Sequence, residues 1–171
     1  MTYFREQQQF RQGWLWLLFG GISLPVVGFL GYGVYQQMVL GQPFGVHPAS
    51  DFALSGVFTL ILVLHTLVIA LFWYARLDVQ VNATELTVRF RPFHLKPRHI
   101  PLASITDARA RQYSALGEYG GWGIRMGVHG WAYNVSGDDG VQLTLADGRR
   151  ILIGSRRSGE LEAAIRSAKG T

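Results

Sequence analysis

The chain has 171 residues, a formal net charge of +5 and no cysteine, which excludes disulfide bonds, thiolate metal sites and a cysteine nucleophile. Charged side chains are sparse before Arg76 and frequent after it, so an apolar part is followed by a charged, mildly basic part. This division predicts a membrane-embedded segment followed by a separate folded domain.

Two long uncharged runs dominate the apolar part, over residues 14–35 and residues 52–75. With a rise of about 1.5 Å per residue, each run is long enough to cross a hydrocarbon core of about 30 Å. Trp14 and Trp16 begin the first run and Trp73 lies near the end of the second, as is typical of aromatic residues at membrane interfaces. The sequence therefore predicts two transmembrane helices over these residues.

The distribution of basic residues predicts the orientation of this hairpin. Residues 36–51 contain no lysine or arginine, whereas Arg5, Arg11 and Arg76 flank the two runs. Positive residues are retained on the cytoplasmic side of a membrane. We therefore expect residues 1–13 to be a cytoplasmic tail, residues 36–51 an extracytoplasmic loop and residues 76–171 a cytoplasmic domain.

His65 lies near the middle of the second uncharged run. An ionisable side chain at that depth is a functional hypothesis by default, here that of an intramembrane polar site. The alternative is a neutral imidazole that is hydrogen-bonded to a neighbouring helix through Ser23 or Thr66. Neither run contains an acidic partner, and this disfavours a proton relay.

The charged part shows the patterns of a small β-rich domain. Residues 77–81 and 86–90 alternate apolar and polar side chains, as do residues 141–145, which the Asp147-Gly148 turn joins to a returning strand. From Ser158 onward, apolar residues recur at helical spacing. We expect an α+β domain with six to seven antiparallel strands, arranged as a partly open barrel that a C-terminal helix caps.

Three further segments carry a family resemblance, namely Arg98–Ile105, Gly120–Arg125 and Ala132–Val135. With the preceding hairpin, they make the chain similar to the bacterial pleckstrin-homology-like (bPH) domain membrane proteins. The resemblance implies a pleckstrin-homology-like domain of seven strands with a capping helix. It also implies a multi-pass protein of the bacterial cytoplasmic (inner) membrane.

Basic residues form the first candidate site, a juxtamembrane collar of lipid headgroup contacts. Its members are Arg76, Arg89, Arg91, Lys96 and Arg98. We expect the collar at the open end of the first hairpin, where the chain leaves the membrane. Each basic residue near an anionic surface contributes about 1 kcal/mol. The alternative is that these charges only retain the domain on the cytoplasmic side.

A glycine- and aromatic-rich stretch forms the second candidate site, a surface for a protein partner. Its members are Tyr119, Trp122, Arg125 and Trp131. Exposed aromatic and arginine side chains are common in protein interfaces. The alternative is that the aromatic residues are core residues and that the glycines allow bends or close backbone approach.

No pattern in the chain indicates catalysis. His47, His94, His99 and His129 lack metal-ligand spacing, and no serine has the context of a catalytic nucleophile. We expect no enzyme activity, no cofactor, no bound metal and no nucleic-acid partner.

The function expected from these features is that of a non-enzymatic scaffold or binding module at the inner face of the cytoplasmic membrane. A protein partner or a homo-oligomer is expected, with an exposed sheet edge as one means of association. One alternative is an anionic-lipid sensor that uses the collar. Another is an accessory subunit of a transporter or channel, built around His65.

Overall fold

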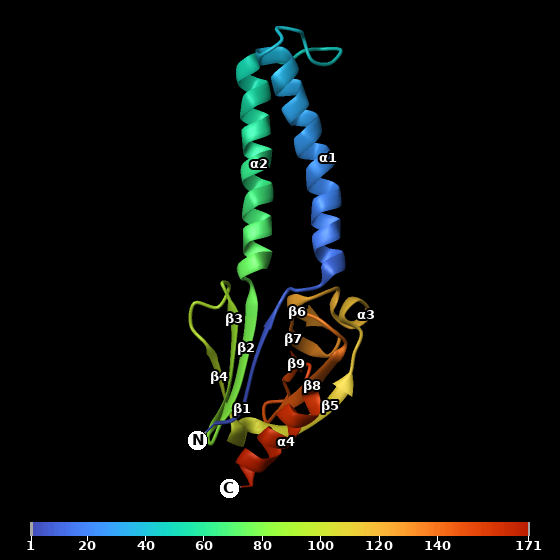
Figure 1. Ribbon diagram of the computed structural model, residues 1–171. Coiled ribbons are helices and arrows are strands. Elements are labelled where there is room, and N and C mark those ends of the chain that lie inside the picture. Colours follow the sequence, from blue (N-terminus) through green and yellow to red (C-terminus); the bar gives the residue numbers. More distant parts are fainter. Residues whose placement is uncertain (1, 171) are drawn as a thin grey trace. The chain divides into compact units, whose positions relative to one another are not determined.

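The computed structural model describes residues 2–170, which form two compact units (Figure 1). One unit, Arg11–Trp73, is helical. The other combines the chain up to Phe10 with the chain from Tyr74 onward, and it consists mainly of strands. The N-terminal segment and the C-terminal domain therefore share one folded unit.

The helical unit contains α1 (Gly13–Met38) and α2 (Asp51–Tyr74), and both are long and apolar enough to cross a membrane. The first helix extends three residues beyond the predicted boundary at residue 35. Aromatic rings join the two helices, because the centroids of Trp16 and Trp73 lie 5.5 Å apart and those of Phe19 and Phe72 5.0 Å apart. The helices therefore pack as a hairpin.

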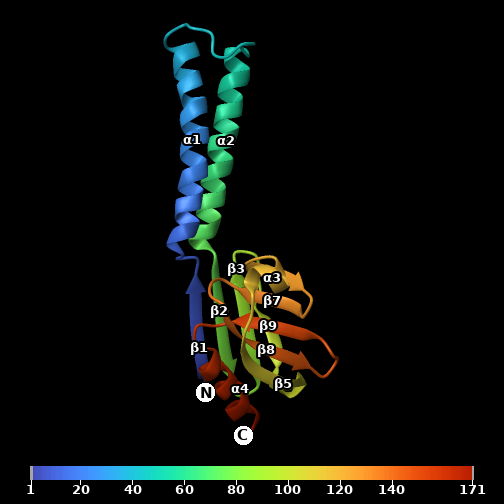
Figure 2. The same ribbon diagram turned by 90° about the vertical axis from the view of Figure 1, so that its right-hand side faces the viewer.

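The strands of the other unit form two sheets (Figure 2). The first sheet has the order β1-β2-β3-β4, with bounds β1 Thr2–Gln9, β2 Arg76–Asn82, β3 Glu85–Arg91 and β4 Arg98–Pro101. The second has the order β5-β8-β9-β7-β6, with bounds β5 Ile105–Gln112, β6 Gly123–Gly127, β7 Gly130–Asn134, β8 Asp139–Leu145 and β9 Arg150–Gly154. All neighbours are antiparallel except β7 and β9, which are parallel.

This topology corrects the predicted barrel of six to seven antiparallel strands. The described chain contains nine strands in two sheets that are not closed into a barrel. The sheets separate after β4, where the short helix η1 (Leu102–Ser104) leads the chain into β5 of the second sheet. Because β4 and β5 do not pair, each sheet keeps its own edges.

Alternation along the strands builds the core of the first sheet. Every second residue of β2 and β3 is no more than 1% exposed: Leu77, Val79, Val81, Leu86, Val88 and Phe90. Successive side chains of a strand point to opposite faces, so these six occupy one face of the sheet. The predicted strands 77–81 and 86–90 are confirmed.

The N-terminal strand β1 corrects the prediction of a tail over residues 1–13. It pairs with β2 and buries Phe4, Glu6 and Gln8 on one face. Gln8 Nε2 donates to the carbonyl oxygen of Gly154 at 2.8 Å, and Ser155 Oγ donates to Glu6 Oε2 at 2.5 Å. These two bonds tie the strand to the last residue of β9 and to the residue that follows it.

The C-terminal helix α4 (Ser158–Lys169) is confirmed. It buries Leu161, Ala164, Ile165 and Ala168, and it packs against β1 and β2 of the first sheet and β5 and β8 of the second. Glu162 Oε2 also accepts a hydrogen bond of 2.8 Å from the backbone N–H of Ala110 in β5. The helix therefore holds the two sheets together.

The connection between the units is short on both sides. Gln9, the last residue of β1, pairs with Arg76, the first residue of β2. Gly13 begins α1 four positions after Gln9, and Tyr74 ends α2 two positions before Arg76. The two apolar helices are thus inserted between two paired strands.

Candidate functional site

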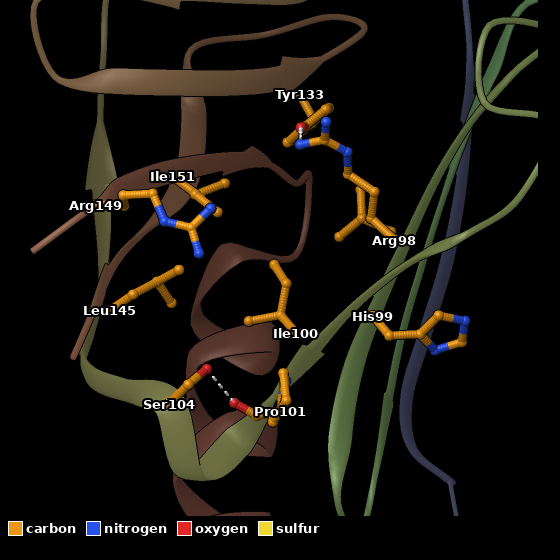
Figure 3. A pocket seen from close by; sticks show the side chains of 10 residues that line it. Arg98, His99, Ile100, Pro101, Ser104, Tyr133, Leu145, Arg149 and Ile151 are labelled. Carbon is orange, nitrogen blue, oxygen red and sulfur yellow. Dashed lines mark hydrogen bonds between the residues drawn. The ribbon is translucent and has the colours of Figure 1, made fainter. Parts of the chain in front are cut away.

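A cavity of about 190 Å³ lies between the two sheets of the strand-rich unit (Figure 3). Its apolar lining comes from both sheets: Val88, Ile100, Leu145 and Ile151. Its polar lining includes Arg98, Tyr133 and Arg149, which come from β4, β7 and the β8–β9 turn. The cavity is therefore lined by apolar side chains, which we call its apolar floor, and by the two cationic side chains Arg98 and Arg149.

Arg98 begins β4 and faces the second sheet. Its Nη1 donates to Tyr133 Oη at 2.5 Å, and its guanidinium carbon lies 5.7 Å from the centre of the Tyr133 ring. Within residues 2–170, no carboxylate forms an ion pair with Arg98. Its positive charge is therefore available to an anion in the cavity.

Tyr133 is only 1% exposed, and burial raises the pKa of its phenol, although Arg98 opposes that shift. The phenol therefore stays protonated at neutral pH. Because its oxygen accepts from Arg98, its own O–H can still donate to a ligand. Arg98 and Tyr133 together offer two adjacent donors.

Arg149 enters the site from the opposite wall, and Figure 3 shows its guanidinium directed into the cavity. The Asp147-Gly148 turn positions it, because Asp147 Oδ2 lies 2.7 Å from Arg149 Nε. Asp147 Oδ1 also accepts from the backbone N–H of Arg149 at 3.0 Å, and this hydrogen bond is the main cause of the lowered pKa of Asp147. His99, in contrast, points away from the cavity in Figure 3.

This arrangement is suited to the binding of an anion. Guanidinium groups bind phosphate and carboxylate oxygens, and an apolar floor accommodates a short hydrocarbon part. The hydroxyl of Ser104 is engaged, because it donates to the carbonyl oxygen of Pro101 at 2.7 Å. No group of three potential metal ligands occurs among the described residues. The cavity fits a small anion with an apolar substituent.

The residues of the predicted basic collar lie in four different settings. Arg91 Nε lies 3.0 Å from Asp78 Oδ2, and Arg91 pairs in register with Arg76. Arg89 donates to the backbone carbonyl of Leu95 at 3.0 Å. Lys96 is exposed on the β3–β4 loop, while Arg98 turns into the cavity. The collar residues therefore lie near one another along the chain but do not share one free surface.

The predicted partner surface loses one of its members. Tyr119, in the short helix α3 (Ala115–Tyr119), is 3% exposed and belongs to a buried cluster with Tyr113 and Leu152. It is not a surface residue, because the helix turns its ring into the core.

The other members of that surface are more accessible. Trp122 is half-buried against the same cluster, and its indole N–H donates to the carbonyl of Gly137 at 3.4 Å. Arg125 is exposed and donates through Nε to the carbonyl of Trp122 at 3.0 Å. Trp131 is 41% exposed on β7. A partner surface here stays a prediction for these three residues.

His65 is hydrogen-bonded within its own helix, where Nδ1 lies 2.9 Å from the carbonyl oxygen of Ile61. This differs from the expected bond to the neighbouring helix. Ser23 and Thr66 are not its partners in this bond, and Thr66 donates to Leu62 instead.

Sequence reasoning missed Tyr133 and Arg149 as site residues. Tyr133 falls within the Ala132–Val135 segment, and Arg149 follows the Asp147-Gly148 turn, so both lie in segments that the sequence singles out. No local pattern indicates that either faces Arg98. Only the packing of the two sheets brings these three residues around one cavity.

His94 should make the loop that borders the cavity sensitive to acid. Its ring packs against Tyr133 with centroids 5.5 Å apart, and its Nδ1 accepts from the backbone N–H of Phe90 at 3.2 Å. Burial, and then the charge of Arg98, lower the pKa of His94. The loop is therefore most stable above the ordinary histidine pKa of about 6.5, and this stability is lost as the pH falls through the lowered value.

We expect the exchange protection of the Phe90 amide to fall below about pH 6.5, where an unperturbed histidine is half protonated. Hydrogen exchange, corrected for the intrinsic pH dependence, measures this. His94→Gln is the control, because an amide does not titrate and its loop should lose the acid sensitivity. A measured His94 pKa at or above the ordinary value would contradict the prediction.

Comparison of the chain with protein-family models, curated proteins and solved structures finds no match to any of them. The resemblance to the bacterial pleckstrin-homology-like membrane proteins therefore stays a prediction.

Proposed function

We propose that this chain is an integral membrane protein that presents a non-enzymatic binding module at the inner face of the cytoplasmic membrane. Helices α1 and α2 are the anchor. The lack of lysine and arginine in residues 36–51 supports an outward position for that loop, which leaves both termini inside. Anchoring raises the effective concentration of the module near membrane-bound partners, so a modest affinity suffices.

The observation that carries the binding function is the cavity between the sheets. It places Arg98, without a carboxylate partner among residues 2–170, beside the protonated Tyr133 and above an apolar floor. An anion gains charge-assisted hydrogen bonds there, and an attached alkyl group covers Ile100 and Ile151. The ligand class that we propose is a small phosphate or carboxylate with a short apolar substituent.

Calorimetry on the full chain in zwitterionic nanodiscs tests this assignment. The probes are butyl phosphate, inorganic phosphate and 1-butanol, which separate the anionic contribution from the apolar one. Butyl phosphate should bind more tightly than either other probe. Arg98→Met should weaken its binding about tenfold or more, because a hydrogen bond to a charged group contributes about 1.5–3 kcal/mol.

Arg109→Met is the matched control. Arg109 is an exposed arginine on β5 whose Nε lies 2.9 Å from Asp107 Oδ2, and it does not line the cavity. Its replacement should leave the binding of butyl phosphate unchanged. If Arg98→Met and Arg109→Met bind this probe equally well, the cavity is not the binding site.

A further inference from the structure

The loop between β3 and β4, residues 92–97, displays two large apolar side chains. Phe93 is 57% exposed and Leu95 is 86% exposed. Single exposed apolar residues are ordinary on protein surfaces, but this pair lies in a short loop that follows Arg91 and contains Lys96. The loop thus combines apolar tips with positive charge.

Four hydrogen bonds among residues 89–95 hold the loop in this conformation. The N–H of His94 donates to the carbonyl oxygen of Phe90 at 2.7 Å, and the N–H of Phe90 donates to His94 Nδ1 at 3.2 Å. Arg89 donates to the carbonyl oxygens of His94 and Leu95 at 3.3 and 3.0 Å. His94 is thereby turned inward against Tyr133.

His94 is turned inward, whereas Leu95 is 86% exposed and Phe93, whose ring centroid lies 5.9 Å from that of Phe90, keeps 57% of its side chain exposed. The four hydrogen bonds therefore hold the loop in a conformation that leaves these two apolar side chains exposed. Such a loop is suited to bind a surface that covers the side chains of Phe93 and Leu95 and removes them from water.

Chain connectivity limits how far this loop lies from α2. Arg91 pairs with Arg76, and Tyr74, two positions before Arg76, ends the helix. Paired residues lie about 5 Å apart and consecutive Cα atoms about 3.8 Å apart, so the Cα of Phe93 lies within about 20 Å of the helix end. This limit holds for any orientation of the strand-rich unit about Ala75. Within that unit, both views place the loop at the end where β2 begins (Figures 1 and 2).

We propose that residues 92–97 dock into the headgroup region of an anionic bilayer, with Phe93 and Leu95 at the acyl boundary and Lys96 at the lipid phosphates. The inference rests on the membrane anchoring of the proposed function, but not on the cavity. Charge selects the lipid, because residues 76–98 hold five basic side chains (Arg76, Arg89, Arg91, Lys96 and Arg98) and two carboxylates (Asp78 and Glu85), a net charge of +3. The apolar tips supply the contact that interfacial segments use.

The lack of cysteine makes a site-specific test direct, because one introduced thiol is the only thiol in the chain. Leu95→Cys would be labelled with the fluorophore NBD in the full chain, in nanodiscs of phosphatidylcholine with or without phosphatidylglycerol. With the anionic lipid, its emission should shift to the blue and be quenched by doxyl-labelled lipid. Quenching by aqueous iodide should be severalfold weaker than in phosphatidylcholine alone.

Ala163→Cys is the matched control, because Ala163 is exposed on α4, which lies at the opposite end of the unit in both views (Figures 1 and 2). Its label should remain accessible to iodide in both lipids. Lys96→Glu should abolish the blue shift at position 95, whereas Arg109→Glu on β5 should preserve it.

A label at Leu67, in the C-terminal half of α2, separates failure of the loop from failure of the anchor. If this label is quenched by doxyl lipid while the Leu95 label stays open to iodide, loop docking is overturned and anchoring stands. If neither label is quenched by lipid, the anchoring is wrong and the loop inference fails with it. Equal protection of Leu95 in both lipids would overturn the role of the anionic headgroup.

Discussion

Deletion of residues 2–9 should unfold the strand-rich unit, although these residues are separated from β2 by both apolar helices. The deletion removes strand β1, its ladder with β2, and the buried Phe4. It also removes the partners of Gly154 and Ser155. Burial of a phenylalanine alone accounts for about 3–5 kcal/mol, against a total domain stability of about 5–15 kcal/mol.

Single substitutions in β1 show which face of the strand accounts for this loss of stability. Phe4→Ala should lower the free energy of unfolding by about 3–5 kcal/mol, because it leaves a cavity in the core. Gln7→Ala is the control on the exposed face of the same strand and should change it by less than about 0.5 kcal/mol. Urea-dependent pulse proteolysis of the full chain in nanodiscs measures both. If Phe4→Ala is as stable as Gln7→Ala and as the unchanged chain, β1 does not contribute to the core and is a dispensable tail.

Gly130→Ala should be among the most damaging single substitutions in the chain. A Cβ atom at this position would lie 2.1 Å from the carbonyl oxygen of Arg150, which is backbone and cannot rotate away. The φ angle of +92° adds a conformation that alanine rarely adopts. The substitution should force apart the parallel strands β7 and β9 and lower the free energy of unfolding by more than about 3 kcal/mol.

Gly137→Ala separates the clash from the backbone conformation. Gly137 also has a positive φ, +75°, but a Cβ there would meet nothing within 4 Å. It should cost only the left-handed backbone penalty of about 1–2 kcal/mol. Thermal unfolding, with hydrogen exchange of the β9 amides, compares the two variants. Similar losses in both would mean that the close approach of Gly130 to Arg150 is not a structural constraint.

Where the inward positions of a strand are all apolar, the sequence alone predicts the element. This holds for β2 and β3, whose alternation is complete, and for the amphipathic helix α4. The two uncharged runs likewise predict helices α1 and α2, because length and apolar composition are local properties. These elements need no knowledge of their neighbours.

The N-terminal strand β1 could not be predicted from the local sequence pattern. Two of its inward residues are Glu6 and Gln8, so its polar sequence lacks the alternating apolar signal. Their burial becomes favourable only because Ser155 and Gly154, from the far end of the chain, provide partners. The glycine-rich stretch also depends on tertiary structure. Glycine is required at position 130 only because the carbonyl oxygen of Arg150 lies close to it in the folded chain.

The candidate site also depends on tertiary structure. The sequence identified Arg98 as a basic residue at the membrane surface, and the fold instead turns it toward Tyr133 in the second sheet. Periodicity indicates which residues of an element face inward, but not which element they face. The cavity exists because η1 sends the chain from one sheet to the other, leaving β4 and β5 unpaired and bringing Arg98, Tyr133 and Arg149 around one space.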